Sequence, residues 1–260
     1  LDGHKLHLHP ARVAEWQAGE RIAPIYIDMG ITQTCNVACK FCYYMVPENR
    51  TSSTIPTDAL IEFLKCSAEM GVKAIGFLGD GEPTLHPGVY DAVEAGANFG
   101  LDMAIATNGV ALKSDRLPKF LESLSWIRFT LAVGQPEAYQ RVMGGNEKTF
   151  EKVVKNIKRC VEIKKELELP VVIGMQMVLI EDCLDQVVPQ AELGRRLGVD
   201  YFVVKQTSES GSEEKDNVQH GLVLDNYSQY EEIFLKAEAF SDQDYKVVIK
   251  REKMDKKTRN

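Results

Sequence analysis

One junction between a helix and a strand occurs three times in the sequence, as Met70-Gly-Val-Lys73, Phe99-Gly-Leu-Asp102 and Leu197-Gly-Val-Asp200. In each copy, glycine follows a stretch with helical periodicity, and a short apolar run typical of a buried strand begins within two residues. Strands that alternate with helices pair in parallel through right-handed crossovers. The repeated junction therefore predicts an α/β fold built on a parallel sheet.

Six strand–helix units can be counted along the chain, which is too few for a complete barrel. We therefore expect a partial (β/α)6 TIM-like barrel with an open parallel sheet. In such a fold the loops after the strands share one face, where active sites gather. The strands are expected at residues 25–31, 73–78, 101–106, 126–133, 171–180 and 201–205, with a further strand at 245–249. The helices are expected at residues 12–17, 57–70, 88–99, 114–124, 146–168, 184–197 and 225–240.

The chain divides into an N-terminal arm at residues 1–23, a core domain at 24–249 and a charged C-terminal tail at 250–260. Its 260 residues, 44% of them hydrophobic, suit a single α/β domain with a full core. The chain begins at Leu1 and not at Met, so we leave open whether the natural start precedes this sequence.

Composition excludes several classes of protein. The net charge of −7 is modest and spread out, which disfavours a nucleic-acid partner. No apolar run reaches about 18 residues, so no segment is expected to span a membrane. The six cysteines lack the density of a disulfide scaffold and fit a reducing cytoplasm.

A cysteine array follows the first expected strand. Cys35, Cys39 and Cys42 have the spacing C-x3-C-x2-C, so one loop offers three thiolates to a small metal centre. A [4Fe–4S] cluster normally takes four cysteines, and three leave one iron open to a second molecule. Two other interpretations stay open: part of a structural zinc site, whose fourth ligand is not evident nearby, and a disulfide with one free thiol.

With Phe41 before the third cysteine, the array resembles the C-x3-C-x-aromatic-C signature of the radical S-adenosylmethionine (SAM) enzymes. The resemblance implies that the amino and carboxylate groups of SAM chelate the open iron. It also implies that an electron from the cluster cleaves SAM to methionine and a 5′-deoxyadenosyl radical, which abstracts hydrogen from a substrate. A donor such as flavodoxin or ferredoxin would supply that electron.

The resemblance extends over residues 24–249 and is strongest to the core domain of the SPASM or twitch type. In those enzymes a cysteine-rich C-terminal extension binds auxiliary clusters. Here no cysteine follows Cys183. Two explanations stay open: the chain is a truncated piece of a longer one, or this branch works without auxiliary clusters.

The stretch Gly79-Asp80-Gly81-Glu82-Pro83 follows the second expected strand. It can be a plain turn, because Asp-Gly is a turn dipeptide. As a binding loop, its small residues would let the backbone approach a ligand, and Glu82 would offer a carboxylate to an ammonium group. The stretch resembles the glycine-glycine-glutamate-proline motif that holds the amino group of SAM. Asp80 is inserted relative to the simplest form of that motif, so either carboxylate can make the contact.

Five further positions fall on the same expected face. Thr107 and Asn108 follow the third strand. The resemblance assigns Thr130 on the fourth strand to the SAM ribose or carboxylate, and Gln176 on the fifth to the ribose. It also places the strand-six backbone around Val204 beside the adenine. Ordinary turn and strand polarity remains an alternative for the four polar residues.

Cys183 follows the expected end of the fifth strand near Ile180. A thiol there could donate a hydrogen atom to a substrate radical, which is how some radical SAM epimerases complete their reaction. The alternative is that Cys183 begins the next helix and packs against the fifth strand.

Two classes of function follow. The first is a radical SAM enzyme that oxidises, epimerises or rearranges a small-molecule or peptidyl substrate such as a sugar, a sugar nucleotide or a peptidyl residue. The second is a zinc-binding structural or interaction module on an α/β scaffold.

Overall fold

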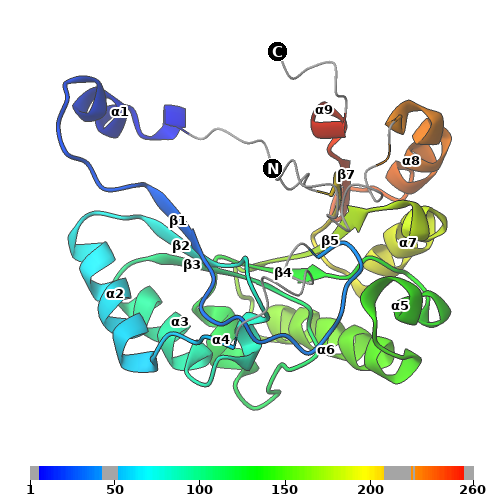
Figure 1. Ribbon diagram of the computed structural model, residues 1–260, viewed down its shortest axis with the longest axis horizontal. Helices are drawn as coiled ribbons and strands as arrows, with labels where there is room; N and C mark the ends of the chain where they lie inside the picture. Colours follow the sequence, from blue (N-terminus) through cyan, green and yellow to red (C-terminus); the bar gives the residue numbers. More distant parts are fainter. Residues whose placement is uncertain (1–5, 43–51, 208–223, 225, 255–260) are drawn as a thin grey trace.

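The computed structural model describes residues 6–42, 52–207, 224 and 226–254. Seven parallel strands pair in chain order into one open sheet (Figure 1). The open parallel sheet confirms the predicted fold class, with the further strand included in the sheet. The strands are β1 Tyr26–Met29, β2 Ala74–Phe77, β3 Asp102–Thr107, β4 Trp126–Thr130, β5 Val172–Leu179, β6 Tyr201–Gln206 and β7 Lys246–Ile249.

The helices follow the strands and lie along the outer side of the curved sheet, with α1 set apart on the N-terminal arm (Figure 1). Within the described residues, no helix is both long and apolar enough to cross a membrane. The helices are α1 Pro10–Gln17, α2 Thr57–Glu69, α3 Val89–Asn98, α4 Leu117–Glu122, α5 Pro136–Met143, α6 Glu147–Glu166, α7 Val187–Leu197, α8 Glu231–Glu238 and α9 Arg251–Met254. Short 3-10 turns lie at Leu6–Leu8, Pro83–Leu85, Glu181–Gln186 and Tyr227–Tyr230.

The three repeated junctions have the same backbone geometry. Gly71, Gly100 and Gly198 adopt φ values of +90°, +85° and +75°. In each junction the N–H of the following residue donates to a carbonyl five residues back, as Val72 does to Ser67 at 3.0 Å. A left-handed glycine of this kind ends a helix and satisfies its last carbonyls. The junction then leads directly into the next strand.

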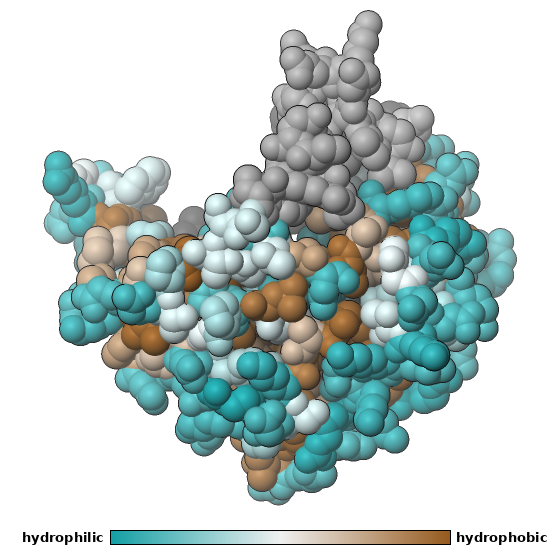
Figure 2. Space-filling view, turned by 60° about the horizontal axis from the view of Figure 1, so that its bottom comes forward, coloured by the Kyte–Doolittle hydropathy of each residue, from teal (hydrophilic) through white to brown (hydrophobic). Residues whose placement is uncertain are grey.

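Side chains on the two faces of the sheet differ in character because they alternate along each strand. The face toward the helices is apolar and forms the core between sheet and helices. It carries the fully buried Ile75, Met103, Ile127, Ile173 and Phe202. Beyond the helices, the outer surface is mostly hydrophilic with scattered apolar patches (Figure 2).

The inner face carries small and polar side chains. Asp28 pairs in register with Gly76, and Ala106 pairs with Arg128. Gly174 pairs with Tyr201. The small residues leave room inside the half-barrel for the larger polar ones.

Several element boundaries differ from the prediction. The expected helix at 184–197 begins with a 3-10 turn, and the one at 225–240 divides into a 3-10 turn and α8. The expected helix at 114–124 shortens to α4. Helix α5 was missed because it is short, although Pro136 at its start and Gly144 at its end are typical helix signals.

The first residues of the charged C-terminal stretch join the fold. Helix α9 places Met254 in the hydrophobic core, where it is 3% exposed. Arg251 forms ion pairs with Glu231 and Glu238, the first and last residues of α8. The packed part of the chain therefore continues past residue 249.

Candidate functional site

A cavity of about 390 Å³ opens at the carboxyl ends of the strands and extends along their inner face. Its volume lies in the range of about 300–1,000 Å³ that is usual for ligand pockets. We call it the thiol cavity because Cys35, Cys39 and Cys42 all line it. The full lining is Asp28, Cys35, Val37, Cys39, Phe41, Cys42, Leu78, Gly79, Gly81, Glu82, Ala106, Thr107, Asn108, Arg128, Thr130, Gln176, Val178, Lys205, Gln206 and Thr207.

The end of helix α5 holds the cysteine loop in place. The N–H groups of Ala38 and Lys40 donate to the carbonyls of Met143 and Val142, at 3.1 and 3.0 Å. These carbonyls belong to the last turn of the helix, where carbonyl groups have no partners within the helix. Gly144 ends the helix with φ +72°, and a Cβ there would lie 2.7 Å from the Ala38 carbonyl oxygen. Helix and loop are therefore in direct backbone contact.

We expect Gly144→Ala to lower the free energy of unfolding by about 1–2 kcal/mol, because L-residues are strained in the left-handed region. The added Cβ would also push against Ala38, so the variant should retain less iron after reconstitution. Gly100→Ala is the matched control, because its φ is +85° but no atom lies within 4 Å of the added Cβ. Urea unfolding should show the conformational loss in both variants and a larger loss in Gly144→Ala, where the Cβ also meets a backbone oxygen. Equal iron retention would contradict a positioning role for the Gly144 contact.

The three thiols differ in exposure: Cys35 is exposed, Cys39 is buried and Cys42 is intermediate. Burial raises the pKa of the Cys39 thiol, and the neighbouring Cys42 and Cys35 raise it further. A bare thiolate is therefore disfavoured here, and cations bound to the sulfurs would offset that cost. Asn108 Nδ2 donates to Cys35 Sγ at 3.9 Å, so a polar group already faces one sulfur.

Tyr139 provides a second polar group beside the thiols. Its hydroxyl is fully buried and has no hydrogen-bond partner among the described residues. Burial raises the pKa of the Tyr139 phenol, and the nearby Cys39 and Cys35 raise it further. A raised pKa favours the protonated hydroxyl, which can donate to an acceptor bound there.

The donor set fits a cluster. Among the described residues, no three His, Cys, Asp or Glu side chains converge on one point, as a single structural zinc ion requires. A cubane cluster has a different requirement, because each thiolate binds a separate corner iron. Three thiols from one loop and an amide donor line the same cavity and match that requirement, and the buried hydroxyl of Tyr139 lies near Cys39 and Cys35 behind them.

Glu82 is 2% exposed and lies on the cavity wall, where its carboxylate accepts hydrogen bonds from residues at the ends of β2 and β3. Its Oε1 accepts from Thr84 N–H at 3.0 Å and from the hydroxyls of Thr84 and Thr107 at 2.6 Å. Its Oε2 accepts from Asn108 N–H at 2.6 Å. Burial raises the pKa of the carboxyl, and these four hydrogen bonds oppose that shift. The carboxylate therefore joins the loops after β2 and β3.

Gly81 brings the motif against the cysteine loop. At φ +68°, a Cβ on this residue would lie 2.3 Å from the carbonyl oxygen of Thr32 and 2.8 Å from that of Thr34. The N–H of Glu82 donates to the same Thr34 oxygen at 2.8 Å. The close approach that requires glycine here is between two loops of the protein. Gly79, with φ +115°, faces the thiol cavity itself.

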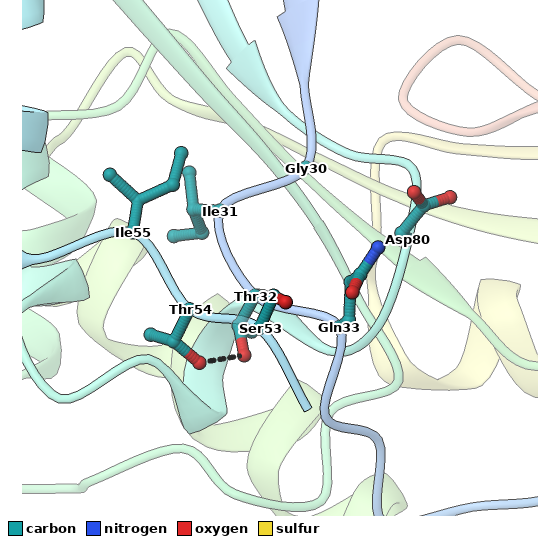
Figure 3. A pocket seen from close by; sticks show the side chains of 8 residues that line it. All are labelled: Gly30, Ile31, Thr32, Gln33, Ser53, Thr54, Ile55 and Asp80. Carbon is teal, nitrogen blue, oxygen red and sulfur yellow. Dashed lines mark hydrogen bonds between the residues drawn. The ribbon is translucent and has the colours of Figure 1, made fainter. Parts of the chain in front are cut away.

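Asp80 does not line the thiol cavity. It lines a second pocket of about 240 Å³ formed with the residues after β1 and the segment at 53–55 (Figure 3). In that pocket Thr32 and Thr54 share a hydrogen bond of 2.8 Å. Of the two carboxylates in the motif, only Glu82 lines the thiol cavity. Pro83 is buried in the turn that follows and lines neither pocket.

Most of the other predicted positions meet at the thiol cavity. Phe41, Thr107, Asn108, Thr130 and Gln176 all line it. Thr130 and Gln176 are paired across β4 and β5, so their side chains lie on the same inner face. Their assigned contacts with SAM remain predictions.

Val204 does not line the cavity. It is fully buried in the core on the helix-covered side of β6, because side chains alternate along a strand. Lys205, Gln206 and Thr207 line the cavity from this strand end. A ligand that borders β6 would meet these side chains.

The structure contradicts the position expected for Cys183, which does not lie on the rim of the thiol cavity. The thiol is fully buried and lines none of the cavities described above. Its Sγ donates to the carbonyls of Ile180 at 3.3 Å and Val178 at 3.6 Å, which closes the turn after β5. Burial raises the pKa of Cys183 to about 12. The residue lies inside the 3-10 turn Glu181–Gln186 and is packed in the core, whereas the alternative made it the first residue of the next helix.

Sequence analysis missed three charged residues of the cavity: Asp28, Arg128 and Lys205. Each stands within an otherwise apolar strand, as Arg128 does in the run Trp126–Thr130. A charge inside a strand with buried neighbours was the signal that could have identified them.

Comparison with known proteins gives a family match. The model of the Radical SAM superfamily matches residues 29–186, which is more than half of the chain. The GTP 3′,8-cyclase of Helicobacter pylori (strain HPAG1) is 24% identical over 191 residues, covering 72% of this chain and 58% of the relative. The tungsten-containing aldehyde ferredoxin oxidoreductase cofactor-modifying protein of Pyrococcus furiosus is 28% identical over 184 residues, covering 69% and 50%. The chain spans about half the length of the curated relatives it matches.

Among solved structures, Streptococcus suis SuiB bound to S-adenosylmethionine shares the fold with a TM-score of 0.70 at 16% identity. The alignment covers 94% of this chain and 55% of SuiB. SuiB bound to the precursor peptide SuiA gives the same TM-score at 17% identity, covering 94% and 53%. The family match does not favour the alternative of a zinc-binding module.

Proposed function

Because the chain belongs to the radical SAM superfamily, which uses a [4Fe–4S] cluster and SAM, we propose that its thiol cavity holds both. We propose further that it acts on a polar small molecule or a peptidyl residue, which it oxidises, epimerises or rearranges. The observation that carries the proposal is the convergence of three thiols from one loop on a cavity that Glu82 and Thr130 also line.

Each part of the cavity has a proposed role. Cys35, Cys39 and Cys42 would hold three irons, which leaves the fourth iron to SAM. Glu82 would receive the SAM ammonium at Oε2, which accepts only one hydrogen bond among the described residues. When bound, the cluster and SAM supply a 5′-deoxyadenosyl radical that abstracts a hydrogen atom from the substrate.

The strands would position the rest of SAM. Thr130 and Gln176, adjacent across β4 and β5, would bind its carboxylate and ribose. Phe41, 8% exposed, would cover one side of the cluster and exclude water. Lys205 to Thr207 would border the adenine in place of Val204.

The names of the relatives support a polar substrate. GTP is a nucleotide and SuiA is a peptide, so both are polar molecules. A small electron-transfer protein such as flavodoxin or ferredoxin would reduce the cluster. All six cysteines lie within the described residues and none forms a disulfide there, which supports a reducing, cytoplasmic location.

Reductive cleavage of SAM tests the proposal. The reconstituted protein, reduced with dithionite under anaerobic conditions, is expected to form 5′-deoxyadenosine and methionine in equal amounts, measured by mass spectrometry. Samples without reductant or without cluster should form neither. A protein that carries a full cluster and SAM but yields no 5′-deoxyadenosine would contradict the proposal.

A further inference from the structure

The inner wall of the thiol cavity carries a guanidinium that the roles proposed above leave unused. Arg128 lines the cavity from the middle of β4, and Asp28 lines it from β1. Arg128 forms no ion pair with any carboxylate of the described residues. A partly buried cation with no counter-charge is unfavourable unless a ligand supplies one.

Aromatic groups hold this guanidinium in a fixed position. Its Cζ lies 5.1 Å from the ring centre of Trp126, two residues earlier on the same face. The phenol of Tyr201 on β6 lies close enough for the guanidinium to lower its pKa against the effect of burial. Its Nε is buried and has no partner among the described residues. A planar guanidinium with an unused donor matches the geometry of a carboxylate or phosphate group.

Another arginine of the chain shows what a paired guanidinium looks like. Arg116 also lies over an aromatic ring, at 5.3 Å from the centre of Tyr90. Unlike Arg128, it forms ion pairs with Asp91 at 2.6 Å and Glu94 at 3.0 Å. Both arginines therefore contact an aromatic ring, but of the two only Arg116 pairs with carboxylates.

Two glycines make room for this arrangement. A Cβ at Gly174, the β5 neighbour of Arg128, would lie 2.1 Å from the ring of Tyr201. A Cβ at Gly76 would lie 2.3 Å from the hydroxyl of Tyr26, which donates to Asp28. The two tyrosines therefore lie over these glycines, Tyr26 beside Asp28 and Tyr201 beside the strand pair of Arg128.

The depth of Arg128 separates it from the position proposed for SAM. It stands two residues before Thr130 on β4, which is roughly 6–7 Å deeper along the strand. A group bound there would lie beneath SAM, on the inner face of the sheet.

We propose that Arg128 binds the anionic group of the substrate, a carboxylate or a phosphate, and that Asp28 accepts a hydrogen bond from a hydroxyl or amino group of the same molecule. This inference rests on the proposed function and adds a substrate class to it. Substrates with an anionic group are bound, and neutral polyols of similar size are not.

Trp126 reports on the site directly. The chain has two tryptophans, and Trp16 is 66% exposed on α1, so Trp16→Phe leaves Trp126 as the reporter. The reconstituted, SAM-loaded protein is titrated with inorganic phosphate, with succinate and with erythritol, and Trp126 fluorescence is followed. We expect a saturable response to at least one anion and none to erythritol. The anion that responds distinguishes a phosphate from a carboxylate substrate.

Arg128→Gln should weaken the anion response at least tenfold, while iron content and SAM affinity stay within twofold. Arg116→Gln is the matched control and should leave the response unchanged. If Arg128→Gln does not retain the cluster, Arg128→Lys is tested in its place. It should also weaken the anion response at least tenfold.

Three results would overturn the inference: an anion response that survives the Arg128 substitution, an equal response to erythritol, or a loss of SAM affinity without any anion response. The SAM cleavage assay on the wild type distinguishes a failure of this inference from a failure of the proposed function. If the wild type cleaves SAM and the Arg128 variant still binds anions, only this inference fails. If the wild type does not cleave SAM, the proposed function fails.

Discussion

Replacing Cys35, Cys39 and Cys42 together by alanine is expected to remove the cluster iron and to abolish formation of 5′-deoxyadenosine. All three thiols come from one loop on the cavity wall, and no other cysteine lines that cavity. The wild type should carry about four irons per chain after anaerobic reconstitution, and the variant close to none. Iron analysis and mass spectrometry of the reaction measure the two effects.

Cys66→Ala is the matched control, because this thiol is exposed on α2, away from the cavity, and donates to Glu62 on the same helix. It should keep the full iron content and the full yield of 5′-deoxyadenosine. Retention of cluster iron in the triple variant would contradict the ligand assignment.

Glu82→Ala is expected to have two separate effects. Losing a charge-assisted contact of about 1.5–3 kcal/mol should weaken SAM binding roughly ten- to a hundredfold. Removing the carboxylate also leaves the buried N–H of Asn108 and the hydroxyl of Thr107 without their acceptor. Each buried donor left without an acceptor lowers the free energy of unfolding by about 1–3 kcal/mol. Calorimetric titration with SAM and urea unfolding measure the two effects.

Glu82→Gln separates these effects. Its amide oxygen can still accept from Thr84 and Thr107, so the stability loss should be smaller than in Glu82→Ala. Its neutral amide cannot attract the SAM ammonium, so SAM binding should weaken as strongly. Asp80→Ala, at the second pocket, should leave SAM affinity unchanged. Wild-type affinity in Glu82→Gln would limit Glu82 to a structural role.

The fold could be predicted because its determinants are local. Each of Gly71, Gly100 and Gly198 ends a helix through contacts within six residues, so the surrounding sequence contains the whole signal. The cysteine spacing is local in the same way, and the structure places all three thiols on one cavity.

What could not be predicted depends on contacts between distant segments. The carbonyls of Val142 and Met143 fix the cysteine loop from more than a hundred residues away, and nothing in either stretch indicates that pairing. The same limit applies to Glu82, whose hydrogen bonds reach Asn108 on the next loop. Sequence analysis assigned Glu82 to the ligand alone, whereas its carboxylate also joins two loops.

Two positions show why the direction of a side chain could not be predicted. Cys183 was placed near the cavity because it follows β5, but its thiol turns inward and closes a 3-10 turn. Val204 lies on the correct strand and faces the helices. Strand alternation decides such cases only when the boundaries and the inner face are known.

The central claim is that the three-thiol loop leaves one iron open for SAM in this cavity. Electron–nuclear double resonance of the reduced, reconstituted protein with SAM labelled with ¹⁵N at the amino group and ¹⁷O at the carboxylate tests it most directly. We predict hyperfine coupling of both nuclei to a [4Fe–4S]⁺ signal, which only direct chelation to the open iron produces. A cluster signal that is unchanged by labelled SAM, at concentrations where SAM binds, would contradict the claim.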